Sequence, residues 1–285
     1  MRIATRASAL ALAQAESVAR RIDGAELVPM TTAGDRDRAA GDPKLLGQDK
    51  GRWVSELERA LLAGEVDAAI HSSKDVPTQV AGGLTLVPVE RLDARDALCG
   101  APSLDALPEG ARVGTSSLRR EAQLRALRPD LDVAELRGNV DTRLRRLAEG
   151  DFDAIVIARA GLQRLGRTEE AGAALDELIP AAGQGTLVLE LREGEPSPLA
   201  VDVAVLNAWN AERALIAALE ADCDTPVGAH AQALDGPLVL RAFVGRPDGS
   251  AWVTDELTGS DPNDLGAEVA RRLFAAGAAE VLGRT

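Results

Sequence analysis

Aromatic residues, cysteine and histidine are scarce in this chain of 285 residues. Tyrosine is absent and aromatic residues make up 2%, so leucine, valine, isoleucine and alanine must fill the cores. The two cysteines, Cys99 and Cys223, make no disulfide framework, and with two histidines they offer no metal cluster. No apolar run approaches the roughly 18 residues that a membrane span needs. We therefore expect neither a metal centre nor a membrane partner.

The charge of the chain is unevenly distributed. A formal net charge of −13 argues against nucleic acid as a partner, because nucleic-acid-binding proteins present a positively charged surface to the phosphates. Residues 112–146, however, contain nine arginines and five acids, a charge of +4, so the other residues carry −17. A local positive field in an acidic protein predicts a particular anionic ligand. The first six residues lack the apolar core of a signal peptide, which predicts a cytoplasmic protein.

A turn of small hydroxyl residues within this basic stretch favours anion binding. The turn contains Thr115 and Ser117 and precedes a helix that opens at Leu118. Free backbone N–H groups, the positive end of the helix and hydroxyl donors converge at such a turn. Arg119 and Arg120 follow directly, and guanidinium groups bind carboxylates through two parallel hydrogen bonds.

A second turn, at residues 136–139, leads into another amphipathic helix. At about 100° per residue, Arg143 flanks the apolar stripe of this helix, whereas Arg145 and Arg146 point away from it. We therefore predict Arg137 and Arg143 as ligands of the anion. The alternative is that all these arginines are exposed helix charges, which is the usual position of such residues.

Strand-like and helix-like segments alternate along most of the chain. The first half has apolar strand patterns and helical periodicities in the order 2–5, 8–22, 26–32, 53–63, 66–70 and 84–89. The alternation resumes through 112–114, 117–128, 131–136, 139–149, 153–158 and 160–166. This order predicts two doubly wound α/β domains with a cleft between them. A helix near 207–220, strands 238–244 and 251–257, and a helix 264–278 indicate a smaller α+β domain.

Two other turns place candidate residues where ligands commonly bind. Arg6 and Ser8 stand at the start of a helix, although Arg6 alone could equally be a surface charge at a strand end. Asp75 follows the strand 66–70, and ligands of open α/β sheets bind at the carboxyl ends of strands. The alternative is that Lys74 and Asp75 are simply a polar pair in a turn.

Cys223 occupies an irregular loop among acidic residues, which do not lower the pKa of a thiol. This setting argues against a protease-type thiolate and suits a thiol that reacts once with a strongly electrophilic partner. The alternative is a spare loop thiol. The glycine-rich segment 179–185 lacks the Lys-Ser/Thr pair of a phosphate-binding loop.

Five motifs, in order along nearly all of the chain, resemble those of the porphobilinogen deaminase family. They are RIATRASALALAQ at 2–14, HSSKDVPT at 71–78, VGTSSLRR at 113–120, LRGNVDTRL at 136–144 and CDTPVG at 223–228. The resemblance implies two periplasmic-binding-protein-like α/β domains around a cleft and a small C-terminal α+β domain. The expected domains are residues 1–93 with 186–202, residues 94–185, and residues 203–285.

The resemblance also assigns roles to residues of this sequence. Asp75 would be the catalytic acid, supported by Lys74, and Cys223 would hold a dipyrromethane cofactor through a thioether. The residues implied in cofactor binding are Thr115, Ser117, Arg119, Arg120 and Lys74. Those implied in substrate binding are Arg6, Ser8, Gln14, Arg137, Arg143, Arg164 and Gln184. Lys50, in the segment GQDKGRW, stands at the position of a family lysine.

The implied reaction joins four porphobilinogen molecules head to tail, with loss of four ammonias, to give hydroxymethylbilane in porphyrin biosynthesis. Asp75 would hydrogen-bond the pyrrole N–H groups and stabilise the cationic azafulvene that forms when ammonia leaves. We expect a monomer with no nucleic acid or membrane partner. The alternative, from another class, is a two-domain solute-binding module whose arginines hold a dicarboxylate. Such a module has no need of Cys223.

Overall fold

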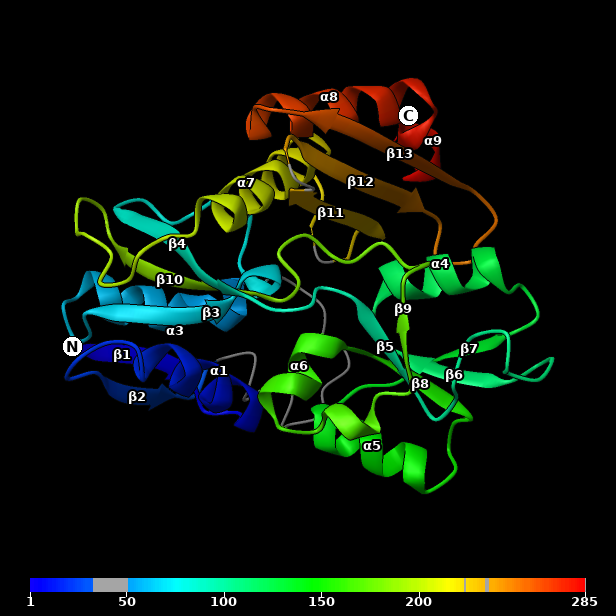
Figure 1. The fold of residues 1–285 in the computed structure, drawn as a ribbon, viewed down its shortest axis with the longest axis horizontal. Coiled ribbons are helices and arrows are strands. Elements are labelled where there is room, and N and C mark those ends of the chain that lie inside the picture. Colours follow the sequence, from blue (N-terminus) through cyan, green and yellow to red (C-terminus); the bar gives the residue numbers. More distant parts are fainter. Residues whose placement is uncertain (33–50, 223, 234–235, 285) are drawn as a thin grey trace.

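The computed structural model describes residues 1–32, 51–222, 224–233 and 236–284, and of residues 51–53 the backbone alone. Within these residues the chain forms three sheets, each covered by helices (Figure 1). The first sheet lies at the left of the figure, the second at the lower right and the third at the top.

The first sheet has the strand order β2-β1-β3-β10-β4. Its strands are β1 (Arg2–Arg6), β2 (Glu26–Met30), β3 (Ala68–Ser72), β4 (Leu84–Arg91) and β10 (Thr186–Arg192). β1 runs parallel to β2 and β3, whereas β10 enters antiparallel between β3 and β4. Successive residues of β1 face opposite sides, so Ile3 packs under α1 (Ala9–Ala19) and Ala4 under α3 (Gly51–Leu62).

The second sheet has the order β7-β6-β8-β5-β9 and repeats the pattern of the first. Its strands are β5 (Asp96–Cys99), β6 (Arg112–Thr115), β7 (Asp132–Glu135), β8 (Ala154–Ala158) and β9 (Ala173–Leu175). On one face Val113 packs against α4 (Leu118–Leu127). On the other face Ile155 packs against α5 (Val140–Ala148) and α6 (Arg159–Arg164). A short 3-10 turn, Thr168–Glu170, precedes β9.

Two crossovers connect the first and second sheets. One runs from β4 to β5, and the other runs from β9 back to β10. They touch each other, because the backbone N–H of Leu92 donates to the carbonyl of Gly185 at 3.1 Å. Gly185 has φ +84°, and a Cβ there would lie 2.6 Å from the Leu92 carbonyl oxygen, so this close approach requires glycine.

The third sheet is an antiparallel meander of β11 (Val227–Ala233), β12 (Leu238–Gly245) and β13 (Trp252–Gly259). Helices α7 (Val203–Ala218) and α8 (Pro262–Ala275) pack together on one of its faces, and α9 (Ala278–Val281) ends the chain. α7 also contacts β4, so it lies between the third sheet and the first (Figure 1).

The architecture confirms the fold class predicted from the alternation of segments, including the cleft-forming pair of α/β sheets. The sequence patterns missed β5, β9 and β11, and they started α7 four residues too late. β5 and β9 have four and three residues, too few to show the alternation of apolar and polar residues that marks a strand. β11 is rich in alanine and glycine, so its pattern is weak as well. Within the described residues, no helix combines the length and apolar character needed to cross a membrane.

Candidate active site

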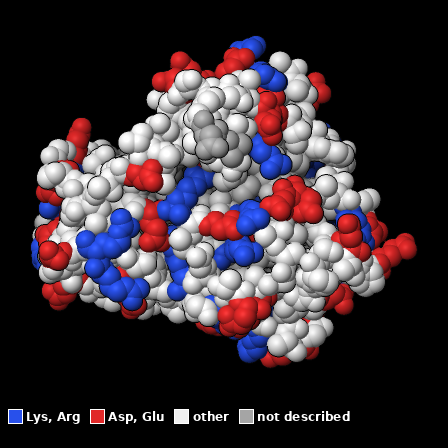
Figure 2. Space-filling view, in the orientation of Figure 1, with Lys and Arg blue, Asp and Glu red and all other residues white. Residues whose placement is uncertain are grey.

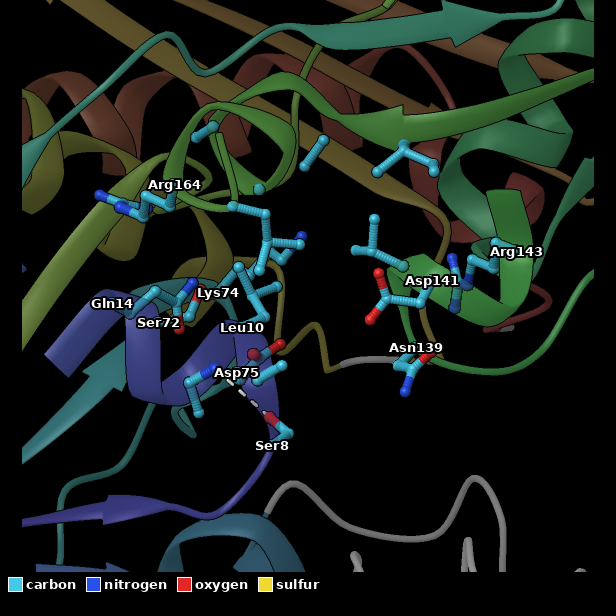
Figure 3. Close-up of a pocket in the computed structure, with 18 of the residues that line it drawn as sticks. Ser8, Leu10, Gln14, Ser72, Lys74, Asp75, Asn139, Asp141, Arg143 and Arg164 are labelled. Carbon is cyan, nitrogen blue, oxygen red and sulfur yellow. Dashed lines mark hydrogen bonds between the residues drawn. The ribbon is translucent and has the colours of Figure 1, made fainter. Parts of the chain in front are cut away.

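A cavity of about 210 Å³ opens between the first and second sheets. Figure 2 shows Lys and Arg side chains, interspersed with Asp and Glu, along the junction of these two parts of the molecule. The close-up in Figure 3 looks into the cavity, with Ser8, Lys74 and Asp75 on one side and Asn139 and Arg143 on the other. Its lining includes eight of the residues predicted to form the site: Arg6, Ser8, Gln14, Lys74, Asp75, Arg120, Arg143 and Arg164.

The wall formed by the first sheet has two parts. Ser8 caps α1, and its hydroxyl accepts a hydrogen bond from the Ala11 N–H at 3.3 Å. β3 ends at Ser72 and continues into the 3-10 turn Ser73–Asp75, so the carboxyl end of the strand presents Lys74 and Asp75 to the cavity. The sequence prediction that this strand end faces a ligand site is therefore consistent with the geometry.

Burial lowers the pKa of Lys74 to about 8, although the adjacent Asp75 carboxylate opposes the shift. The positive charges of Arg120 and Arg119 act in the same direction as burial. An amine with this pKa exchanges its proton readily near neutral pH, which is the property that acid–base chemistry requires.

The opposite wall is formed by the turn and first residues of α5. Asn139 caps the helix, with its side-chain oxygen 2.8 Å from the Thr142 N–H. Arg143 is held by two hydrogen bonds, from Nε to the Gly138 carbonyl at 2.9 Å and from Nη2 to Ser116 Oγ at 3.0 Å. These bonds fix the guanidinium beside the cavity rather than over the outer face of the helix.

Arg120 reaches the cavity from a buried cluster centred on Asp96. Asp96 Oδ1 accepts hydrogen bonds from Arg120 Nη2 at 2.7 Å and from Gln184 Nε2 at 2.8 Å. Arg119 Nη2 lies 2.8 Å from Asp96 Oδ2. Burial would raise the pKa of Asp96, but the two arginines outweigh it and hold that pKa well below its usual range. One carboxylate thus faces two guanidiniums, and the cluster has a net positive charge.

Arg164 joins the two walls. Its Nη2 donates to Glu90 Oε1 at 2.8 Å and to the Gly185 carbonyl at 2.9 Å. Arg164 belongs to α6 of the second sheet, Glu90 to β4 of the first, and Gly185 to the returning crossover. Burial lowers the pKa of Arg164, and its pairing with Glu90 opposes that shift.

The lining as a whole is cationic. Five basic side chains (Arg6, Lys74, Arg120, Arg143 and Arg164) line the cavity against two carboxylates (Asp75 and Asp141). In a partly enclosed site such charges interact more strongly than in water. The arrangement suits an anion with several carboxylates and leaves an acid at one wall.

Two family models match this chain over most of its length. The family model described as "Porphobilinogen deaminase, dipyromethane cofactor binding domain" matches residues 1–199. The family model described as "Porphobilinogen deaminase, C-terminal domain" matches residues 206–275. The chain belongs to the porphobilinogen deaminase family.

Individual relatives agree with this assignment. The chain is 46% identical to porphobilinogen deaminase of Rubrobacter xylanophilus, over 99% of this chain and 96% of the relative. It is 46% identical to that of Thiobacillus denitrificans, over 98% and 97%, and 42% identical to that of Deinococcus radiodurans, over 98% and 97%.

Among solved structures, the second substrate-binding domain of a putative amino acid ABC transporter from Streptococcus pneumoniae has a TM-score of 0.43 at 12% identity. The match covers 68% of this chain and 84% of that one.

Not every motif residue of this porphobilinogen deaminase family member lies along the cavity. Arg119 and Gln184 are buried behind its wall, where they contact Asp96, and Arg119 also donates to the Ile179 carbonyl at 2.7 Å. Arg137 is 46% exposed and pairs with Glu135 at 2.6 Å. In this structure Arg119, Gln184 and Arg137 contact carboxylates of the protein itself, and their roles as ligands stay predictions.

The hydroxyl turn before α4 is organised internally. Thr115 is buried, and its Oγ1 accepts a hydrogen bond from the Ser117 N–H at 3.2 Å. Ser117 is the N-cap residue of α4. Thr115 and Ser117 are not among the residues that line the cavity.

Cys223 and Lys50 lie outside the described residues. Beside the position of Cys223, Asp222 Oδ1 accepts hydrogen bonds from the Thr225 hydroxyl at 2.6 Å and from the Asp224 N–H at 3.0 Å. Burial and the charge of Asp222 raise the pKa of Asp224. The other cysteine, Cys99, is fully buried in the second sheet, and burial raises its pKa to about 11.

Asp96 and Glu90 organise the site but were not predicted from the sequence. A signal for Asp96 was present, because it opens the apolar run Asp96–Cys99, and a carboxylate within a buried strand must be paired. Glu90 has no comparable signal, since the charged segment around it is typical of a surface loop.

Proposed function

We propose that this protein joins four porphobilinogen molecules head to tail, releasing ammonia, to form hydroxymethylbilane in porphyrin biosynthesis. The observation that carries the proposal is the cationic cavity with Asp75 at one wall, in a chain of the porphobilinogen deaminase family. Each porphobilinogen brings an acetate and a propionate group, so a growing chain gains negative charge with every addition. Guanidinium groups on both walls neutralise that charge.

The donor set fits a dipyrromethane group. The side chains that would hold its carboxylates are Arg120, Arg143 and Lys74, because they line the cavity and are cationic. We propose Cys223 as the attachment point through a thioether. When bound, the dipyrromethane supplies the free pyrrole carbon to which substrate is joined.

We propose Asp75 as the catalytic acid. Loss of ammonia from the aminomethyl group of porphobilinogen breaks a C–N bond and leaves positive charge on the pyrrole. A carboxylate at the cavity wall accepts the pyrrole N–H hydrogen bond and stabilises that charge as it forms. Lys74, with its pKa of about 8, can hold or release a proton beside Asp75. Arg6, Ser8, Gln14, Arg143 and Arg164 would orient the substrate.

The test is to supply porphobilinogen to the purified protein and to follow ammonia and tetrapyrrole by mass spectrometry. We expect four ammonias for each product. Asp75→Asn should reduce turnover by about 100-fold or more, because the shape is kept and the charge is lost. Asp105→Asn, at an exposed turn of the second domain, is the matched control and should retain activity. Porphobilinogen binding without ammonia release would instead support a solute-binding module.

We also propose the domain division 1–93 with 186–202, 94–185, and 203–285, a monomeric state and a cytoplasmic location. The three separate sheets support the division. Gel filtration with light scattering would test the monomer, and a dimer would contradict it.

A further inference from the structure

Helix α7 holds both ends of the segment that carries Lys74 and Asp75. At the start of the segment, Trp209 Nε1 donates to Ser73 Oγ at 2.6 Å, and both residues are buried. At its end, Arg213 Nη2 donates to the carbonyls of Thr78 at 2.6 Å and Pro77 at 3.1 Å. The third domain thus contacts the active-site turn directly, through α7.

Ser73 is enclosed on its other side by the returning crossover. Gly183 has φ +71°, and a Cβ there would lie 2.3 Å from Ser73 Oγ. The N–H of Gly183 donates to Glu212 Oε2 of α7 at 2.7 Å. The Ser73 side chain therefore fits between α7 and a glycine that α7 also holds.

The ring of Trp209 packs in a small apolar cluster with Val54, Val76 and Val188. The guanidinium of Arg213 lies 5.0 Å from the centre of this ring. The ring is therefore fixed on several sides, and its N–H group has a defined direction toward Ser73.

The turn Ser73–Asp75 is a single 3-10 turn, so its three side chains point in different directions. Ser73 points toward α7, whereas Lys74 and Asp75 line the cavity. A shift of the Ser73 backbone moves Lys74 directly and Asp75 through Lys74, because the three residues form one 3-10 turn.

We infer that Trp209 is a positioning residue: its bond to Ser73 sets the orientation of Lys74 and Asp75 in the cavity. The inference rests on the proposed function, and it concerns two residues to which the family motifs give no role. A buried hydroxyl that loses its donor is left with an unsatisfied group, so the turn relaxes toward another orientation. A displacement of about 1 Å at a catalytic group can cost about 100-fold in rate.

The experiment compares Trp209→Phe, which keeps a ring and removes the donor, with Trp252→Phe. Trp252 is 50% exposed on β13 and provides the same substitution away from the turn. We expect Trp209→Phe to lower kcat for porphobilinogen by about 10- to 100-fold, with KM changed less than about twofold. Trp252→Phe should match the parent protein.

Ser73→Ala removes the acceptor of the same Trp209–Ser73 hydrogen bond. It should lower kcat to a similar degree, and the double variant with Trp209→Phe should be no slower than the slower single variant, because one bond is lost in each case. Losses that multiply in the double variant would overturn the inference. So would a Trp209→Phe protein that melts earlier but keeps its kcat, because that result describes a structural role alone.

The outcomes separate the two proposals. If neither the parent nor Trp252→Phe releases ammonia from porphobilinogen, the proposed function fails. If both are active and Trp209→Phe equals them in kcat, only the positioning role of Trp209 fails.

Discussion

Arg164 and Glu90 form an ion pair of 2.8 Å that spans the two walls of the cavity. The Arg164 side chain is 4% exposed and that of Glu90 is 19% exposed, so solvent screens the pair little. Because Arg164 also holds the Gly185 carbonyl, one guanidinium links both sheets and the crossover between them. The pair therefore restrains the relative movement of the two walls.

Glu90→Gln should loosen this restraint. The neutral amide keeps the shape of the side chain but loses the charge that holds Arg164, so the crossover near Gly185 should open more often. Hydrogen exchange of the amides in 183–187 should become about tenfold faster, as expected for the loss of a charged hydrogen bond. Glu121→Gln breaks an ion pair with Arg125 within a single helix and serves as the control. Equal exchange in both variants would show that the pair does not restrain the walls.

Arg143→Leu should impair chain growth, whereas Arg145→Leu should not. The two residues lie on the same helix, but Arg143 lines the cavity and Arg145 is 62% exposed and paired with Glu149. Loss of one guanidinium–carboxylate contact should lower kcat/KM by about 10- to 100-fold. Native mass spectrometry should then reveal a partly extended chain on the Arg143 variant. Normal product formation by this variant would remove Arg143 from the substrate site.

Asp96→Asn should strongly destabilise the fold, because it leaves Arg119 and Arg120 buried with no carboxylate between them. Removal of one partner from such a buried group costs about 3–5 kcal/mol in the free energy of unfolding. Denaturant unfolding measures this quantity. Asp132→Asn, whose carboxylate is 57% exposed and lies 3.8 Å from Arg112, should have little effect. If the two variants are equally stable, the cluster does not depend on Asp96.

Asp96 also shows where sequence patterns stop being informative. The helices and most strands follow from local periodicity. Ser8, Lys74 and Asp75 were predicted at the site because they stand at the ends of elements, and Arg143 because it flanks the apolar stripe of its helix. Asp96 contacts Arg120 and Gln184, which are 24 and 88 positions away. Asp96 and Arg120 lie on β5 and α4 of the second sheet and Gln184 on the crossover back to the first, so the folded chain brings the three residues together from separate elements. Local patterns contain no information about such contacts, so the burial of Arg119 and Gln184 beside Asp96 could not be predicted from them.

Lys74 should make stability depend on alkaline pH. Its pKa is about 8 in the folded protein, against about 10.4 for an ordinary lysine. The folded state therefore disfavours the charged form. This destabilisation is complete below about pH 8, decreases as the pH rises from about 8 to about 10.4, and is absent above that range. Between pH 7 and pH 10 the folded protein should gain about 2 kcal/mol relative to Lys74→Met. The measurement is denaturant unfolding at both pH values.

This comparison is best made in a Cys223→Ser background, which keeps a covalent dipyrromethane out of the cavity under the proposed function. Lys74→Met removes the titrating amine and keeps a side chain of similar length. A stability difference that stays constant from pH 7 to pH 10 would show that the amine remains fully solvated.

The two cysteines allow a direct test of the covalent attachment. Cys99 is fully buried in β5, and its pKa of about 11 leaves almost no thiolate at neutral pH, so it should be unreactive. The intact mass of the purified protein should exceed the sequence mass by one dipyrromethane group. Cys99→Ser should keep this excess and Cys223→Ser should lose it, together with turnover. An active protein of unmodified mass would contradict the tether, because then no thioether is needed to start the chain. If Cys99→Ser lost the excess mass and Cys223→Ser kept it, the second sheet would have to open and expose β5.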